Sequence, residues 1–238
     1  MQATAGTTPL TESPPRRPLR TSLLFGLAAV TGIVDAVCYL GLGRVFTANM
    51  TGNVVLLGFA VAGVESLSVS RSVTALAAFL VGAVLGVRLA RSIDTSVQVW
   101  PAAAFASEAA LLLISAALAG SVSVEPSAVL TRVYAIIALT GVAMGMRNAT
   151  IRRFGEREVN TTVLTMTLTA IGSDSVFAGG SNQGALRRLG FVMSVLTGAA
   201  VGALLLRYSA GLALGVAGAA SSVCAIAAYL DTQQPSRT

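Results

Sequence analysis

The stretch GIVDAVCYLGLGRVFTANMTGNVVLLG, from Gly32 to Gly58, decides how this chain must fold. Inside an apolar background it carries a carboxylate, an arginine, two threonines and two asparagines. Polar side chains at the depth of a bilayer cost several kcal/mol each unless they are paired or hydrated. If the surrounding chain lies in a membrane, the polar residues of this stretch are therefore the first candidates for a functional site.

The composition of the whole chain indicates a membrane protein. The chain has 238 residues, of which 54% are hydrophobic and 11% are charged, and its mean hydropathy is +0.77. A soluble domain carries about 25% charged residues, so this chain has too few charges to cover a water-facing surface. Apolar runs close to the length of a bilayer span recur along it, which is typical of a polytopic protein.

The charged residues exclude several classes of function. The net charge of +6 comes from 16 arginines without any lysine. These arginines lie in short loops between apolar runs, as orientation charges do, so we do not expect nucleic-acid binding. Histidine is absent and the two cysteines have no metal-type spacing. We therefore predict buried thiols, no metal site, no cofactor, no catalytic residues and no enzymatic activity.

Eight apolar segments predict an all-α bundle, because backbone exposed to lipid must satisfy its own hydrogen bonds. The Thr/Pro-rich residues 1–20 predict a disordered cytoplasmic tail, residues 21–231 a single transmembrane domain, and residues 232–238 a second tail. The segments cover residues 22–43, 47–64, 72–91, 98–119, 129–147, 159–176, 187–206 and 209–230. The second and the sixth are short and rich in hydroxyl and amide groups.

Markers repeated along the chain predict two related halves. GAVLGVRLAR, from Gly82 to Arg91, resembles GAAVGALLLR, from Gly198 to Arg207, 116 residues later. Asp35-Ala36 precedes Asn148-Ala149 by 113 residues, with the polar segments at matching offsets. The predicted halves are residues 21–120 and 128–231.

The arginines favour six spans over eight. If all eight segments crossed with the N-terminus inside, eight arginines would lie on each side, and no orientation would be favoured. If segments two and six enter and leave on one side, twelve lie inside and four outside. We therefore predict six full spans, two short polar-interrupted segments, inverted halves and cytoplasmic termini. Eight spans with parallel halves remain the alternative.

Two deeply placed acids are candidate functional groups. Asp35 lies past the middle of the first segment, where a carboxylate is normally paired, protonated or in contact with water. A structural hydrogen bond to a neighbouring helix is its alternative role. Glu108, midway along the fourth segment, is either a second titrating group or the partner of an arginine such as Arg132.

Amide and hydroxyl side chains in the two short segments are candidate solute or ion ligands. Capping of a helix start would explain one or two of them, and threonines often bond only to their own helix. A broken helix can also coordinate a cation or a small polar solute. The candidates are Asn49, Thr51, Asn53, Asn148, Thr161 and Thr162.

Pairs of glycines four residues apart predict close helix packing, and such faces can also join two copies of a chain. They are Gly82/Gly86, Gly141/Gly145, Gly198/Gly202 and Gly211/Gly215.

The run VDAVCYLGLGRVFTANMTGNVVLLG, together with the later GMRNATIRRFGEREVNTTVLTMTLT, resembles the YoaK-type family of bacterial multi-pass membrane proteins. The resemblance extends over nearly the whole chain after residue 20. Members of that family more often carry Gln-Asn where this chain has Arg147-Asn148. The resemblance implies the bacterial inner membrane as the location and supplies no established activity.

The polar residues in two matched short segments favour a small secondary transporter or facilitator for a small polar or ionic solute, embedded in the lipid bilayer. Its site would lie between segments two and six, with Asp35 as the coupling group. The alternative is a non-transporting membrane regulator or partner subunit, in which the same polar motifs only hold helices together.

Overall fold

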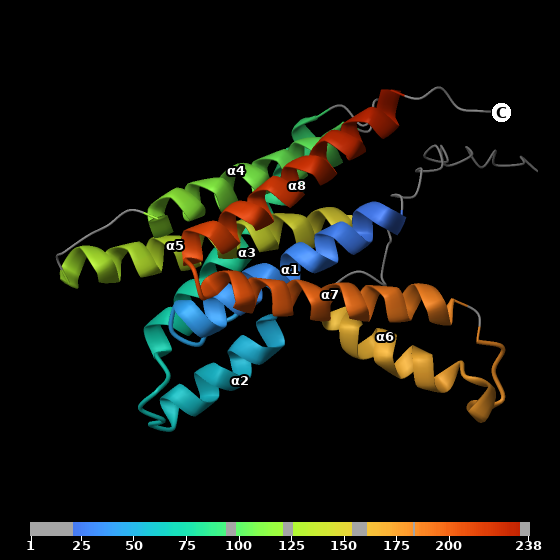
Figure 1. Cartoon of the computed structure of the whole chain (residues 1–238), viewed down its shortest axis with the longest axis horizontal. Coiled ribbons are helices and arrows are strands. Elements are labelled where there is room, and N and C mark those ends of the chain that lie inside the picture. Colours follow the sequence, from blue (N-terminus) through green and yellow to red (C-terminus); the bar gives the residue numbers. More distant parts are fainter. Residues whose placement is uncertain (1–20, 94–98, 121–125, 154–160, 183, 234–238) are drawn as a thin grey trace, which may run out of the picture.

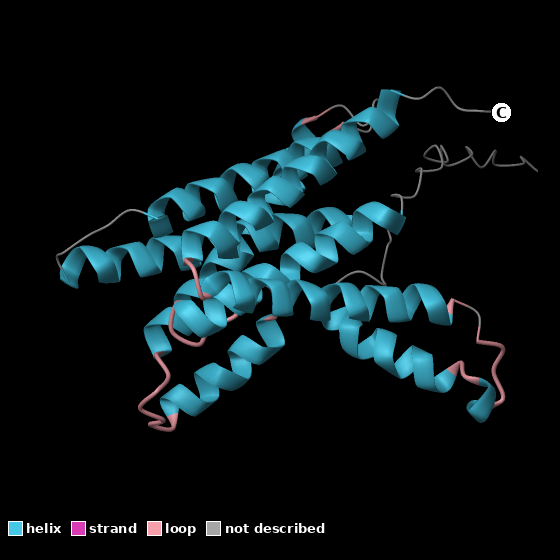
Figure 2. Cartoon of the chain, viewed as in Figure 1, coloured by secondary structure: helices cyan, strands magenta, loops and turns pink. Residues whose placement is uncertain are grey.

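The computed structural model describes residues 21–93, 99–120, 126–153, 161–182 and 184–233. Within these ranges the chain is helical, with short connecting turns and no strand (Figure 2). The predicted tail of residues 1–20 and most of the C-terminal tail lie outside them. The helices are α1 (Thr21–Gly41), α2 (Met50–Val61), α3 (Val69–Ser92), α4 (Trp100–Gly120), α5 (Pro126–Arg153), α6 (Thr161–Ser173), the 3-10 turn η3 (Val176–Ala178), α7 (Ala185–Leu206) and α8 (Ala210–Gln233).

Helix lengths confirm the predicted bundle of six long and two short elements. Six described helices are long and apolar enough to cross a bilayer, namely α1, α3, α4, α5, α7 and α8. The two polar segments form the short helices α2 and α6, with 12 and 13 residues. Neither short helix reaches the roughly 20 residues that a full span requires.

The long helices pack as three pairs, α1 with α7, α3 with α5, and α4 with α8. In the α3–α5 pair the backbones touch, because a Cβ added at Gly82 would lie 2.1 Å from the carbonyl oxygen of Val142, and Gly86 meets Met146 one turn later. The numbers rise together, so the two helices run in the same direction. Glycine is required here because any side chain would separate the helices.

The α1–α7 pair repeats this packing in the same register. Gly198 lies against Ala29, and Gly202 lies against Ile33 one turn later. Val142 and Met146 follow Ala29 and Ile33 by 113 residues, while Gly198 and Gly202 follow Gly82 and Gly86 by 116. The predicted small-residue pairs on α3 and α7 thus pack against other helices of the same chain.

Other contacts between the helices also occur in matched pairs, in which α1, α2, α3 and α4 correspond to α5, α6, α7 and α8. Contacts of α4 with α5, α2 with α3, and α3 with α4 are matched by those of α8 with α1, α6 with α7, and α7 with α8. Figure 1 shows α1 and α5 running in opposite directions. These contacts are the ones that two inverted halves would make, and the division into halves stays a prediction from the sequence.

The segment after α1 folds back into the bundle. Gly43 (φ 101°) and Arg44 (φ 61°) reverse the chain, and the left-handed region they occupy favours glycine. Leu42, Val45 and Ala48 are buried as the segment returns inward. In Figure 1, α2 and α6 both begin near the middle of the molecule and diverge toward opposite ends.

Candidate functional site

Two side chains hold the returning segment in place. One carboxylate oxygen of Asp35, Oδ1, accepts hydrogen bonds from the backbone N–H groups of Thr47 and Ala48, each at 2.9 Å. Asn53 accepts from the backbone N–H of Phe46 at 2.8 Å and donates to the carbonyl oxygen of the same residue. A backbone segment without helical hydrogen bonds is stable at this depth only with such partners.

Asn49 begins α2. Its side-chain oxygen accepts from the backbone N–H of Gly52 at 3.3 Å, as an N-cap residue does. Just before it, the hydroxyl of Thr47 is buried and lies 3.5 Å from the sulfur of Cys38. The sequence pattern TANMTGN is thus partly explained by capping and anchoring of the helix start.

A cavity of about 410 Å³ lies beside this helix start, between α3 and α5. We call it the α3–α5 cavity. Its polar lining comes from the start of α2 and from α5, and the residues that α3 contributes are all apolar. The residues that line it are Ala48, Asn49, Met50, Thr51, Phe79, Ala83, Val87, Asn148, Ala149 and Arg152.

A second cavity, of about 370 Å³, lies between α1 and α7, and we call it the α1–α7 cavity. Asp35 lines it from α1, and Asn49 borders both cavities. Leu164 is the contribution of α6. The residues that line it are Thr31, Gly32, Asp35, Ala36, Tyr39, Leu40, Phe46, Asn49, Leu164, Val195, Ala199 and Ala203.

The two cavities are counterparts in the two halves. Three residues that line the α3–α5 cavity follow three that line the α1–α7 cavity by 113 positions: Asn148 follows Asp35, Ala149 follows Ala36, and Arg152 follows Tyr39. The α3 and α7 linings match with an offset of 116, and Thr51 matches Leu164 with an offset of 113. Equivalent surfaces of the two halves therefore form both cavities.

The cavities extend toward opposite ends of the bundle. The α3–α5 cavity is lined from the middle of α3 toward its C-terminal end and by the last turns of the parallel helix α5, and the α1–α7 cavity is lined from the middle of both its parallel helices toward their C-terminal ends. Figure 1 shows that α1 and α5 finish at opposite ends. Residues 48 and 49 thus lie where a passage from one face would meet a passage from the other.

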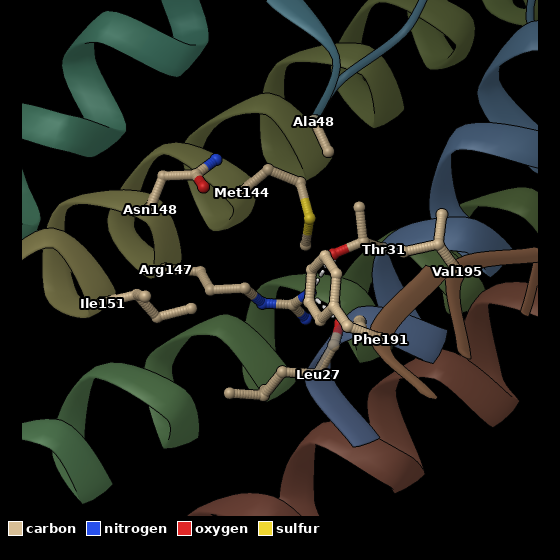
Figure 3. A pocket seen from close by; sticks show the side chains of 10 residues that line it. Leu27, Thr31, Ala48, Met144, Arg147, Asn148, Ile151, Phe191 and Val195 are labelled. Atoms are coloured by element: carbon tan, nitrogen blue, oxygen red, sulfur yellow. Dashed lines mark hydrogen bonds between the residues drawn. The ribbon is translucent and has the colours of Figure 1, made fainter. Parts of the chain in front are cut away.

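A small central hollow lies between the two cavities and shares Ala48 and Asn148 with the first, and Thr31 and Val195 with the second. Its volume is about 10 Å³, which is near the minimum for one water molecule. Figure 3 shows the side chain of Arg147 pointing from α5 into the region between α1 and α7. The bundle is nearly closed at its centre.

Arg147 and Glu108 form a buried ion pair beside this hollow. The Nε of Arg147 donates to Oε2 of Glu108 at 2.7 Å, and Nη2 donates to Oε1. The Nη1 donates to the carbonyl oxygen of Leu27 at 2.6 Å and to the hydroxyl of Thr31 at 2.7 Å. Ser221 donates to Oε1 of Glu108 at 2.5 Å. The network ties α1, α4, α5 and α8 together.

The structure divides the predicted site residues into three groups. Asp35, Asn49, Thr51 and Asn148 line the cavities. Asn53 and Glu108 are 0% exposed and line none of the three described hollows. The side chains of Thr161 and Thr162 lie outside the described residues.

The expected partner of Glu108 is corrected by the structure. The sequence suggested an arginine such as Arg132, whereas the buried partner is Arg147. Arg132 lies near the start of α5 and Arg147 about four turns later, so packing of α4 on α5 decides which arginine meets the acid.

Arg152 and Tyr39 were missed as cavity residues. The offset of 113 residues, already visible between Asp35 and Asn148, places Arg152 at the position of Tyr39 in the other half. Tyr39 and Arg152 lie one helical turn after Asp35 and Asn148, so the same offset predicts that these two residues occupy equivalent positions.

Comparison with known proteins agrees with the membrane architecture. A family model described as a protein of unknown function, DUF1275, matches residues 23–227. The chain belongs to this family. The UPF0700 transmembrane protein YoaK of Bacillus subtilis (strain 168) is 36% identical to it over 158 residues, covering 65% of this chain and 67% of that protein.

The resemblance to YoaK-type proteins predicted from the two polar motifs is thereby confirmed. The family description names no activity. No solved structure matches the chain. These comparisons therefore assign no activity to the chain.

Proposed function

We propose that this protein is a small secondary transporter or facilitator for a small polar or ionic solute in the bacterial inner membrane. The observation that supports this proposal is the pair of matched cavities that meet at Asn49 from opposite ends of the bundle. Transport sites in inverted-repeat proteins lie at the repeat interface, next to broken helices. Asn49, Thr51, Asn148 and Asp35 are the proposed ligands.

Opening and closing would involve the two parallel helix pairs. The pair α1–α7 borders one cavity and the pair α3–α5 borders the other. A tilt of one pair relative to the other would widen one cavity and narrow its counterpart, with the nearly closed central hollow as the barrier. This is rocking of one helix pair against the other around a fixed site, and each pair takes one helix from each half.

Asp35 is the proposed coupling group. It lines the α1–α7 cavity and also holds the backbone of Thr47 and Ala48. A protonated carboxyl is a weaker hydrogen-bond acceptor than a carboxylate. Proton or cation binding at Asp35 would therefore loosen the segment shared by both cavities, which links a charge to the passage.

Transport by purified protein in proteoliposomes tests the proposal. We expect uptake of one class of small solute above that of protein-free vesicles, and we expect Asp35→Asn to alter its rate or its pH dependence. Asp174→Asn is the matched control, because Asp174 forms an exposed ion pair with Arg188 and neither residue lines any of the three described hollows. Unchanged uptake and pH dependence in Asp35→Asn would remove the coupling role.

A partner-subunit role is the second candidate. It is favoured by the burial of Glu108, Arg147 and Asn53 in hydrogen bonds that only join parts of the chain. Purification with a stoichiometric partner, combined with absence of flux for every solute class tested, would favour this role over transport.

A further inference from the structure

The two matched cavities differ in charge. Where the α1–α7 cavity has Asp35 and Tyr39, one helical turn apart, the α3–α5 cavity has Asn148 and Arg152 at the corresponding positions. One half therefore presents an acid and a phenol, and the other an amide and a guanidinium. Equivalent backbone positions have acquired opposite electrostatic character.

The positive charge of Arg152 is not balanced inside its cavity. Among the described residues that line the α3–α5 cavity, Arg152 is the charged one. The buried acid Glu108 is already paired with Arg147, and Asp35 lines the other cavity. Within the described part of the chain, no carboxylate forms an ion pair with Arg152.

The rest of the lining suits a carboxylate with a short apolar body. Asn148 and Thr51 offer an amide and a hydroxyl, both able to donate to an anionic oxygen. On the facing side, Phe79, Ala83 and Val87 provide an apolar wall. The volume of about 410 Å³ falls in the usual range for small-molecule sites.

We propose that the α3–α5 cavity binds a small organic anion, with the guanidinium of Arg152 contacting its carboxylate and the α3 wall contacting its carbon chain. This inference rests on the proposed transport function and names the substrate class for it. The recognised chemistry, an anionic oxygen group, is also that of a lipid phosphate, so the experiment must separate a dissolved anion from a lipid headgroup.

Binding is measured as the shift of the thermal unfolding midpoint of the purified protein in neutral detergent. Sodium butyrate and sodium succinate are the anionic probes, and sodium chloride, methylammonium chloride and glycerol are the comparisons. We expect the two carboxylates to raise the midpoint of the wild type, because a ligand that binds the native state stabilises it. Arg152→Gln should weaken carboxylate binding about tenfold or more, since it removes a charge-assisted hydrogen bond.

The controls isolate the cavity from general surface charge. Arg88→Gln removes an exposed arginine from α3 that does not line the cavity, and it should leave the carboxylate shift unchanged. Arg152→Lys should keep part of the shift, because it keeps the charge but loses the planar guanidinium. Asn148→Asp adds a negative charge inside the cavity and should abolish the shift; it keeps the test decisive if Arg152→Gln does not fold.

Two further arms assign the outcome. Uptake of the same radiolabelled solutes into phosphatidylcholine vesicles, with protein-free vesicles as the baseline, tests transport separately. Carboxylate binding that depends on Arg152 without uptake would support the anion site and count against transport. Uptake of methylammonium or glycerol, with no carboxylate shift, would overturn the anion site and leave transport standing.

The last arm adds phosphatidylglycerol to the micelles and vesicles. If Arg152→Gln changes only the stabilisation by phosphatidylglycerol, and carboxylates do not shift the midpoint, the arginine serves a lipid headgroup and the inference is overturned. An equal carboxylate shift in the wild type and in Arg152→Gln would also overturn it.

Discussion

At the residue scale, Asp35 both stabilises the returning segment and lines the α1–α7 cavity. Its carboxylate binds two backbone N–H groups of the returning segment, and nearby Thr47 covers the buried thiol of Cys38. Loss of the carboxylate leaves two donors without their partner, which costs about 1–3 kcal/mol per buried group. The same residue can therefore link a change of charge to a movement of the backbone.

Asp35→Ala should make Cys38 reactive. In a Cys224→Ala background, we expect a maleimide to label Cys38 faster in Asp35→Ala than in the parent protein, because the segment that covers the thiol is released. Asp35→Asn should lie between the two, since its amide oxygen still accepts one or both hydrogen bonds. Asp174→Ala provides the control, and equal labelling rates in all variants would contradict this role of Asp35.

The buried ion pair allows a second prediction at this scale. Arg147→Gln or Glu108→Gln alone should lower the free energy of unfolding by about 3–5 kcal/mol, because each leaves a buried partner without compensation. The double variant should lose much less than the sum of the single variants. A double-mutant cycle from unfolding in mixed micelles measures this coupling.

The exposed pair of Asp174 and Arg188 is the comparison for that cycle. Its side chains are partly exposed to solvent, and such pairs contribute only about 0–1 kcal/mol. A coupling energy for Glu108 and Arg147 no larger than that of this surface pair would show that the buried network does not hold the four helices together.

At the scale of the element, glycine decides which helices can run side by side. The α3–α5 and α1–α7 pairs bring backbone against backbone at equivalent positions of the two halves. Gly58 in α2 is different, because a Cβ added there meets nothing within 4 Å. The short helix α2 thus has no close backbone contact at this glycine, although it packs against α3.

Alanine at these glycines should therefore have opposite effects. We expect Gly82→Ala and Gly198→Ala to destabilise the protein to a similar degree, because each added Cβ would lie 2.1 Å from a backbone oxygen of the partner helix. Gly58→Ala should stabilise α2 by about 0.5–1 kcal/mol through helix propensity. Thermal unfolding in detergent measures all three, and a large loss in only one of the first two variants would contradict equivalent packing of the halves.

At the scale of the whole molecule, the short helices α2 and α6 begin near the middle of the molecule and diverge toward opposite ends (Figure 1). Because three long helices belong to each predicted half, a six-span topology would make the halves inverted with respect to each other. The turns before α3 and before α7 would then face opposite sides of the membrane. This prediction separates six spans from eight.

Topology can be mapped in whole cells. In a cysteine-less background, Ser66→Cys should react with a membrane-impermeant maleimide added outside, because Ser66 is exposed in the turn between α2 and α3. A reporter fused after Ser96, and another fused after Gly155, should both indicate the cytoplasm. Protection of Ser66→Cys together with an outside signal from both fusions would support eight spans.

The sequence by itself determined the lipid environment, the number of long helices, the two short polar elements and the family resemblance. These depend on composition and on the length of apolar runs, which the bilayer thickness translates directly into spans. It also identified Asp35, Asn49, Thr51 and Asn148, because polar groups in an apolar chain are conspicuous wherever they point.

Only the tertiary structure decided what those groups do. Asn53 turned inward to hold Phe46, and Glu108 met Arg147. Such partners follow from the register of helices packed on each other, and composition carries no record of that register. The cavities likewise depend on this register, because the residues that line each of them come from three or more segments that are far apart in the sequence and meet only through helix packing.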